Sequence, residues 1–297
     1  MTGRDVLTAD DASQLEHVAF GPLSPRPSAS AAGSRVGHAR GFGLEFQDFR
    51  RYRPGDDPRS IDWTIHARLQ QLVVRTYRAD ASLRVHVLLD ASASMALGTP
   101  DKLACAKKLA AMLTYVAVQD RDAVGLATFA TTIGRRVAPG DGRAQLHRIL
   151  QALGDERASG RSSLNRVLTA YADAIRGPGL VVVLSDFFEP AGAWNGLEYL
   201  IHRGLTPAIV QIVAPEEIDP SIDDDTELVD VEDPGAAPLV VDGRSVADYR
   251  ARFAALSESL AAFCRDRRLP WMQVQSSFST ARLLHECVQA GVLAGRG

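Results

Sequence analysis

The fold of this chain is decided by an apolar run that ends in a carboxylate, Val85-His-Val-Leu-Leu-Asp90. Such a run is typical of a β-strand that is covered on both faces, as the strands of a parallel sheet are. A second run of the same kind, Leu180-Val-Val-Val-Leu-Ser-Asp186, occurs later in the chain. An amphipathic helix is predicted over residues 102–119, because the apolar residues there repeat at three- and four-residue spacings. The two runs therefore predict buried strands of a parallel sheet.

The remainder of the chain alternates between these two patterns. Strands are predicted at residues 123–129, 132–137, 207–213 and 271–275, and helices at residues 142–153, 163–175, 191–203, 246–267 and 281–290. This alternation predicts an α/β fold with a doubly wound, mainly parallel sheet. Ligands bind such sheets at the carboxyl ends of the strands, where Asp90 and Asp186 are expected to lie.

Two N-terminal segments precede the α/β pattern at residues 84–297. Residues 1–34 contain one short amphipathic stretch followed by a Pro/Ser/Ala/Gly mixture, which predicts a flexible arm. Residues 35–83 interleave arginines and acids around glycines and aromatic residues. We expect this segment to be ordered but irregular and to pack on the α/β core, as an N-terminal extension of it.

An acidic insertion is predicted at about residues 215–245. Residues 216–233 contain ten Asp and Glu residues and no basic residue. A small hairpin, 227–231 against 239–241, would carry this block outside the sheet. The block is either a solvated loop or a docking surface for a basic partner, which would contact Asp223, Asp224 and Asp225.

The composition excludes several classes of protein. With 297 residues, 46% hydrophobic and 23% charged, the chain can bury a sizeable core, which excludes disordered and fibrous classes. A formal net charge of -3 argues against nucleic-acid binding. The three cysteines, Cys105, Cys264 and Cys287, lie far apart in apolar stretches and indicate buried thiols in a reducing compartment. No stretch approaches the roughly 18–20 apolar residues of a membrane span, so we expect a cytoplasmic protein.

The chemistry of the sequence is concentrated in Asp90-Ala-Ser92-Ala-Ser94. A carboxylate at a strand end, followed by hydroxyls two and four residues later, can direct three hard oxygens into one crevice. Such oxygens suit Mg²⁺, Mn²⁺ or Ca²⁺. The alternative interpretation is a helix cap with two turn serines. The position after a buried strand and the counterpart Ser185-Asp186 favour the metal site, to which Ser162 would add a further hydroxyl.

Enzymatic signatures are weak in this sequence. A phosphatase of the haloacid dehalogenase type needs a second carboxylate at the position of Ser92. A Gly-rich phosphate loop with lysine and a Gly-x-Ser-x-Gly elbow are both missing from the sequence. We therefore expect a protein that is not an enzyme, with a metal-dependent phosphohydrolase that uses Asp90 as its nucleophile as the alternative.

Two sets of residues resemble a known family. Asp90, Ser92, Ser94, Ser162 and Asp186 resemble the metal-ion-dependent adhesion site of von Willebrand factor type A domains. A longer signature resembles the bacterial domain-of-unknown-function 58 family, which joins this segment to a von Willebrand factor A-like domain. It reads Gly41-Phe-Gly-Leu-Glu45-Phe46-Gln-Asp48-Phe-Arg50-Arg-Tyr52-Arg-Pro-Gly55-Asp56-Asp57-Pro-Arg59-Ser-Ile61-Asp62-Trp63, then Ala67-Arg68 and Val74-Arg75-Thr-Tyr77. The resemblance covers about residues 35–290.

The resemblance implies a non-enzymatic interaction module with a divalent cation, most often Mg²⁺, held by those five residues. An Asp or Glu of a partner protein would complete the metal shell. The implied partner is a MoxR-type AAA+ ATPase, in chaperone-like maturation or regulation of other proteins, membrane proteins among them. The second metal loop departs from the family pattern, because Gly160-Arg161-Ser162-Ser163 lacks the usual neighbouring acid and gains an arginine.

A third hypothesis needs no metal. In this hypothesis the protein binds partners through its charged surfaces alone. The acidic block is one of these surfaces. The other consists of arginines in the N-terminal signature, Arg50, Arg51, Arg53 and Arg59.

Overall fold

The computed structural model of the chain describes residues 6–21, 44–52, 61–79, 82–189, 193–220, 227–232, 235, 239–240 and 243–296. The chain divides into two compact units. One comprises Met1–Arg26 and Leu83–Gly297, and the other comprises Pro27–Ser82. Each unit is described by itself.

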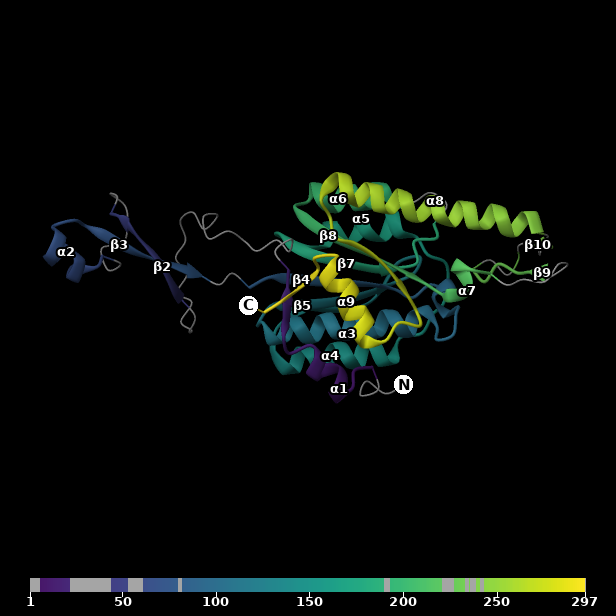
Figure 1. Cartoon of the computed structure of the whole chain (residues 1–297), viewed down its shortest axis with the longest axis horizontal. Coiled ribbons are helices and arrows are strands. Elements are labelled where there is room, and N and C mark those ends of the chain that lie inside the picture. The colour runs from purple at the N-terminus through teal and green to yellow at the C-terminus, as the bar shows by residue number, and fades with distance from the viewer. Residues whose placement is uncertain are drawn as a thin grey trace. The chain divides into compact units, whose positions relative to one another are not determined.

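The larger unit is built on a six-stranded sheet (Figure 1). Its strands, in sheet order, are β11 (Trp271–Gln275), β8 (Leu205–Val213), β7 (Gly179–Ser185), β4 (Arg84–Asp90), β5 (Ala123–Phe129) and β6 (Ile133–Gly140). Five strands run parallel, and the edge strand β6 pairs antiparallel with β5. This order reverses between β4 and β7, as in the doubly wound sheets that bind ligands at the reversal. The predicted α/β fold with a mainly parallel sheet is confirmed.

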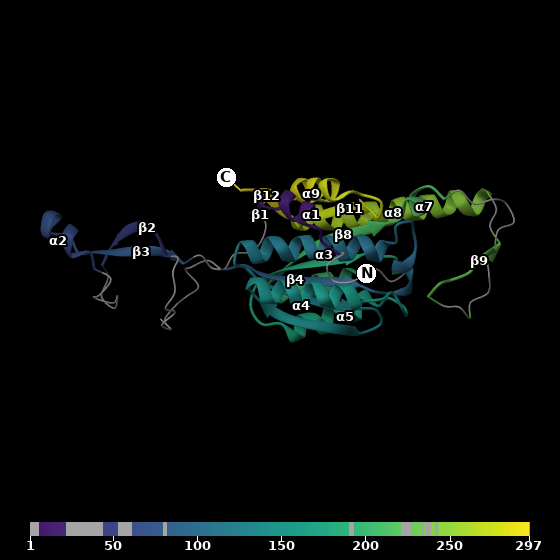
Figure 2. The ribbon, with the colours of Figure 1, turned by 90° about the horizontal axis from the view of Figure 1, so that it is seen from below.

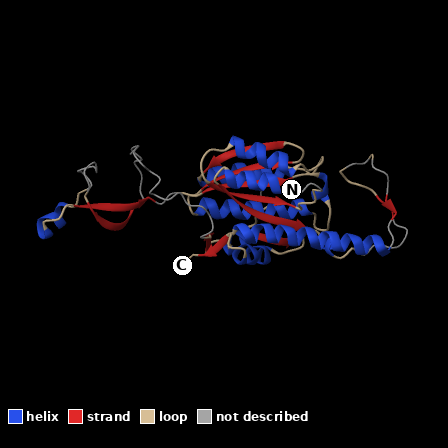
Figure 3. Ribbon diagram, turned by 90° about the horizontal axis from the view of Figure 1, so that it is seen from above, coloured by secondary structure: helices blue, strands red, loops and turns tan. Residues whose placement is uncertain are grey.

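Helices cover both faces of the sheet (Figures 1 and 3). One face packs against α3 (Lys102–Gln119), α4 (Gly142–Asp155) and α9 (Thr280–Gln289). The other packs against α5 (Leu164–Ala174), α6 (Trp194–His202) and α8 (Gly243–Arg267). A short 3-10 helix, Ala93–Ala96, follows β4, and α7 (Pro215–Ile218) follows β8. The elements predicted from periodicity are therefore present, with ends that differ by a few residues.

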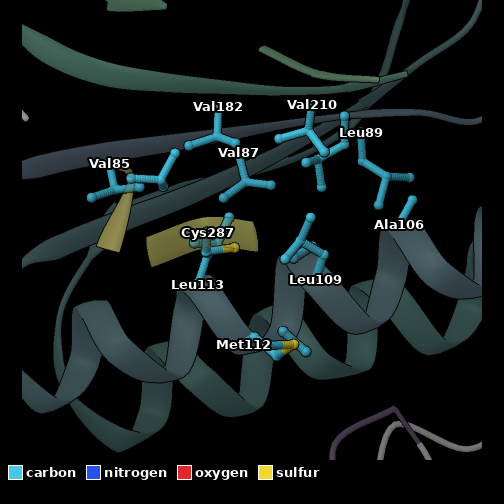
Figure 4. Packing of buried hydrophobic residues seen from close by; sticks show 14 of the residues in the cluster. Val85, Val87, Leu89, Ala106, Leu109, Met112, Leu113, Val182, Val210 and Cys287 are labelled. Carbon is cyan, nitrogen blue, oxygen red and sulfur yellow. The ribbon is translucent and has the colours of Figure 1, made fainter. Parts of the chain in front are cut away.

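The central strand β4 explains why the sheet is buried on both faces. Successive side chains of a strand point to opposite faces. Val85, Val87 and Leu89 accordingly pack on the α3 face, with Leu109 in the same cluster (Figure 4), and Leu88 joins the cluster on the α5 face. Each of these side chains is fully buried, which contributes about 1.5–3 kcal/mol per residue.

The N-terminal residues differ from the expected flexible arm. Residues 6–21 contain α1 (Ala9–Gln14) and β1 (Val18–Phe20), and β1 pairs antiparallel with β12 (Leu293–Gly295) near the other end of the chain (Figure 2). Leu15 and Phe20 are buried in the core that lies under α3. A three-residue strand is too short to show a recognisable periodicity. Its partner also lies at the opposite end of the sequence, so no local pattern predicts the pairing.

Replacing Leu15 with alanine tests this role of the N-terminal segment. We expect the free energy of unfolding to fall by about 2–5 kcal/mol, because the change leaves a cavity in a fully buried site. The exposed neighbour Glu16 provides the control, and its replacement by alanine should change stability by less than about 0.5 kcal/mol. Urea denaturation of both variants measures the difference. Equal stabilities would show that the segment is a dispensable arm.

The smaller unit has more regular structure than the expected irregular segment. Strands β2 (Leu44–Arg51) and β3 (Val73–Ala79) pair antiparallel, with a register shift between Phe46 and Asp48. Between them lies α2 (Trp63–Leu69), which Asp62 caps by accepting hydrogen bonds from the backbone N–H groups of the next turn. The strands were not recognised because charged residues interrupt their apolar pattern. That this unit packs on the α/β core stays a prediction.

The acidic insertion carries the predicted hairpin. Its strands β9 (Glu227–Leu228) and β10 (Leu239–Val240) pair antiparallel and precede α8. Asp223, Asp224 and Asp225 lie outside the described residues.

Two further expectations from the composition concern the cysteines and the membrane. Cys105, Cys264 and Cys287 are buried free thiols, as predicted. In the part of the chain that the structure describes, no helix combines the length and the apolar character needed to cross a bilayer.

Candidate functional site

The candidate site lies where the strand order reverses, between the carboxyl ends of β4 and β7. Asp90 is the last residue of β4, and Asp186 directly follows Ser185 at the end of β7. Both carboxylates are almost completely buried. The predicted juxtaposition of Asp90 and Asp186 follows from the parallel pairing of these two strands.

Backbone hydrogen bonds tie the serine loops together beside Asp90. The N–H of Ala93 donates to the carbonyl of Gly160 (2.8 Å), and the N–H of Ser159 donates to the carbonyl of Ala91 (2.7 Å). Gly160 has a φ of +77°, a left-handed conformation that glycine adopts without strain. These contacts hold the loop that contains Ser162 against the loop that follows β4.

Hydroxyl groups surround the Asp90 carboxylate. Its Oδ2 atom accepts hydrogen bonds from Ser185 Oγ (2.6 Å) and Ser162 Oγ (3.2 Å). Its Oδ1 atom accepts one from the backbone N–H of Ser92 (2.9 Å). The Oγ atoms of Ser92 and Ser94 lie 3.1 Å apart. The structure therefore brings together four of the predicted residues, and it adds Ser185, which the sequence analysis did not assign to the site.

Burial and charge perturb the ionisation of Asp90. Burial is the main cause, and the neighbouring Asp186 the second, of a pKa raised to about 7, although hydrogen bonds from Ser185 and Ser92 oppose the shift. A buried carboxyl group with such a pKa is held in a position where its negative charge is costly. A divalent cation at this place would remove that cost.

Asp186 has a strong partner that the sequence analysis missed. The ammonium group of Lys102, at the start of α3, lies 2.7 Å from Asp186 Oδ2 and 2.5 Å from Glu217 Oε1. Lys102 is fully buried. Burial alone would lower the pKa of Lys102, but the two carboxylates outweigh it and hold the pKa above its ordinary value. The lysine therefore stays protonated and compensates for the buried acids.

A weak signal for Lys102 exists in the sequence. The chain contains only three lysines, and Lys102 opens the helix that follows the Asp90 loop. Of its acidic partners, Asp186 directly follows β7 and Glu217 belongs to α7, which follows β8, so their proximity depends on the order of strands in the sheet. Local patterns do not give this order.

The backbone that follows Asp186 adopts an unusual conformation. Phe187, which is buried, has a φ of +61°, and left-handed conformations are rare for a bulky residue. The turn lets the N–H of Phe188 donate to Asp186 Oδ1 (3.1 Å). Strained backbone of this kind is concentrated at functional sites.

The acidic insertion reaches the same site. Glu232, which follows β9, accepts a hydrogen bond from the backbone N–H of Ser162 through its Oε2 atom (3.3 Å). Glu189 accepts one from the N–H of Leu164 at the start of α5 (2.6 Å). Burial is the main cause of the raised pKa of Glu189, and Glu232 adds to it. A carboxylate from the insertion thus already lies beside the Ser162 loop.

The donor set suits a hard cation with few carboxylate ligands. Asp90, Ser92, Ser94 and Ser162 offer oxygen atoms only, the ligands that Mg²⁺ and Ca²⁺ take. Asp186 shares its charge with Lys102, so it would act as a weaker ligand than the resemblance implies. Within the described ranges, no three His, Cys, Asp or Glu side chains form a metal-binding group. Two carboxylates, hydroxyls and water would have to complete the shell, an arrangement that Mg²⁺ accepts.

The candidate partner-binding arginines are only partly described. Arg53 and Arg59 lie outside the described residues, and the side chain of Arg50 is not described. Arg51 ends β2 and is exposed.

Comparison with known proteins identifies the family. Residues 48–260 match the family described as "Protein of unknown function DUF58". The chain belongs to the DUF58 family. The matched region of this DUF58 protein includes all five candidate metal ligands.

Curated relatives of the DUF58 protein are uncharacterised. It is 30% identical over 207 residues to the uncharacterised protein Mb1516 of Mycobacterium bovis and, equally, to the uncharacterised protein Rv1480 of Mycobacterium tuberculosis. Each match covers 68% of this chain and 62% of the relative. The chain thus spans less than two thirds of the length of these relatives.

Solved structures of bacterial proteins are among those similar to this chain. BatB from Bacteroides thetaiotaomicron is 16% identical with a TM-score of 0.41, and the match covers 70% of this chain and 98% of that one. An aerotolerance-related membrane protein from Bacteroides fragilis is 17% identical with a TM-score of 0.43, and the match covers 70% of this chain and 100% of that one.

Proposed function

We propose that this DUF58 protein is a non-enzymatic interaction module that binds a carboxylate of a partner protein through a divalent cation, with Mg²⁺ preferred over Mn²⁺ and Ca²⁺. The supporting observation is that the hydroxyls of Ser162 and Ser185 donate hydrogen bonds to Asp90, a buried carboxylate whose pKa is raised to about 7 by burial and by Asp186. The implied likeness to metal-ion-dependent adhesion sites agrees with this arrangement. Asp90, Ser92, Ser94 and Ser162 would hold the ion, and Asp186 would act directly or through water.

The local charge favours an incoming carboxylate. Asp90, Asp186 and Glu217 carry three negative charges, which one divalent cation and the ammonium group of Lys102 together offset. A partner Asp or Glu would therefore approach a site that is not negative overall. The partner we propose is the MoxR-type AAA+ ATPase that the resemblance implies, in maturation or regulation of other proteins.

Two adjacent serines allow a matched test of metal binding. Ser162 Oγ contacts Asp90, whereas the side chain of Ser163 makes no capping hydrogen bond at the start of α5. We expect Ser162→Ala to weaken Mn²⁺ or Mg²⁺ binding by about tenfold or more in isothermal titration, and Ser163→Ala to leave it unchanged. Equal affinities for the two variants, or no binding to the unmodified protein, would overturn the metal site.

A second experiment tests the interaction itself. The purified protein should capture the MoxR-type ATPase in Mg²⁺ and release it in EDTA. Capture that persists in EDTA would favour the metal-free hypothesis. Hydrolysis of phosphate monoesters that disappears in Asp90→Asn would instead establish the phosphohydrolase.

Glu232 is expected to compete with the partner's carboxylate. Its own carboxylate lies beside the Ser162 loop, and an isosteric amide would remove its negative charge. We expect Glu232→Gln to strengthen metal-dependent capture of the ATPase by about two- to fivefold, which corresponds to a surface electrostatic contribution of up to about 1 kcal/mol. Glu227→Gln, on the same insertion and exposed, is the control. Binding curves that coincide for both variants would show that Glu232 has no such role.

A further inference from the structure

A groove distinct from the Asp90 site lies at the amino-terminal end of β4, whereas Asp90 lies at the carboxyl end of this strand. It has a volume of about 570 Å³, within the usual range for small-molecule pockets. His86 lines it, and this residue precedes Asp90 by four positions in the strand, which corresponds to about 13 Å. The other walls come from β6 and the end of α5.

The groove combines cationic and apolar walls. Three arginines line it, Arg84, Arg136 and Arg176, and no acidic residue occurs among its described lining. All three are exposed, and none forms an ion pair with a described residue. Val137, Ile175 and the ring of Tyr171 supply apolar surface. Unopposed arginines beside apolar side chains are suited to an organic anion, because guanidinium groups bind oxyanions in bidentate geometry.

Contacts inside the groove hold its positive charge in place. Arg84 donates from Nη1 to the carbonyl of Arg176 (2.7 Å), and the Arg136 guanidinium lies 5.5 Å from the centre of the Tyr171 ring. The buried His86 ring lies edge-on to Tyr171, with its Nδ1 atom 3.2 Å from the Tyr171 hydroxyl. Arg136 is thus held over one ring of a packed aromatic pair, and Arg84 is held against the backbone that follows α5.

The electrostatic effect of the arginines is visible at His86. Burial is the largest cause, followed by Arg84 and Arg136, of a pKa lowered to about 4. At neutral pH the imidazole is therefore uncharged, and the positive charge of the groove comes from its arginines. The Nε2 atom of His86 is also buried without a hydrogen-bond partner among the described residues.

We propose that this groove binds a small organic phosphate, with the phosphate on the arginines and the apolar part of the ligand against Val137 and Ile175. Three cationic side chains provide more charge than a monocarboxylate needs, which favours a dianion. This site is independent of the metal-dependent function proposed above.

The test uses phenyl phosphate as the probe, because it joins a dianion to an apolar ring. In a titration followed by NMR, we expect saturable binding with a Kd below about 1 mM, accompanied by a shift of the His86 ring signals. Arg136→Gln should weaken binding about tenfold or more, since it removes a charge-assisted hydrogen bond. Arg166→Gln changes an exposed arginine of α5 that does not line the groove, and should leave binding unchanged.

Several outcomes would overturn the proposal. Inorganic phosphate that binds as tightly as phenyl phosphate would show that the groove recognises only the ion. Benzoate that binds more tightly would assign it to carboxylates. Equal losses of affinity for phenyl phosphate in Arg136→Gln and Arg166→Gln would place the binding outside the groove. NMR signals of the His86 ring that do not shift would do the same. Arg84 is not used as a variant, because its contact with the Arg176 carbonyl also supports the local fold.

Discussion

Replacement of Lys102 by methionine is expected to lower the free energy of unfolding by about 3–5 kcal/mol, because it leaves the buried Asp186 and the partly buried Glu217 without their cation. Lys102 is fully buried and lies within 2.7 Å of Asp186 and 2.5 Å of Glu217. Methionine has nearly the same length, so the packing loss is small and the electrostatic loss dominates. Chemical denaturation at neutral pH measures the change.

Two further variants separate this electrostatic effect from simple loss of packing. Lys108→Met removes a lysine of the same helix that is 36% exposed and lies 3.9 Å from Asp11, and it should cost less than about 1 kcal/mol. The double variant Lys102→Met/Glu217→Gln should recover part of the lost stability, because only one buried acid then remains uncompensated. If the double variant is less stable than Lys102→Met alone, lost packing rather than lost charge compensation explains the destabilisation caused by Lys102→Met.

Asp90→Asn is expected to have opposite effects on the metal-free and metal-bound protein. Without metal, the amide removes a buried charge next to Asp186 and keeps an oxygen to accept from the Ser92 N–H, so stability at neutral pH should rise by roughly 1–3 kcal/mol. Stabilisation by added Mg²⁺ should disappear. Thermal unfolding with and without Mg²⁺ tests both halves. A variant that is less stable than the unmodified protein in EDTA would show that Asp90 has a structural role.

The raised pKa of Asp90 also gives the pH dependence of the metal-free protein. The unfolded carboxyl group ionises near its ordinary value of 3.8, whereas the folded group keeps its proton up to about pH 7. Between these values the folded state binds more protons, so the free energy of unfolding decreases as the pH rises. The decrease should be roughly 2–4 kcal/mol across this window and should be absent in Asp90→Asn. A flat profile in the unmodified protein would contradict the shift.

Much of the α/β unit could be predicted because its signals are local. The helix at 102–119 has the bounds that its apolar spacing indicated, and the strand at 123–129 does too. Asp90 and Asp186 were placed at one edge of the sheet because parallel strands end together. The N-terminal strand β1 and strand β12 could not be found, since each has three residues and pairs with a segment from the other end of the chain.

The sequence by itself determined the alternation of strands and helices, the two carboxylates at the strand ends and the serines that follow Asp90. These features depend on how side-chain directions repeat along helices and strands, and on residues that are neighbours in the sequence. Only the tertiary structure decided that Lys102 occupies one side of Asp186 and that Glu232 reaches the Ser162 loop. Those contacts join separate strand ends and an insertion. The physical reason is that pairing of buried charges depends on which elements become neighbours in space, and that depends on the strand order of the whole sheet.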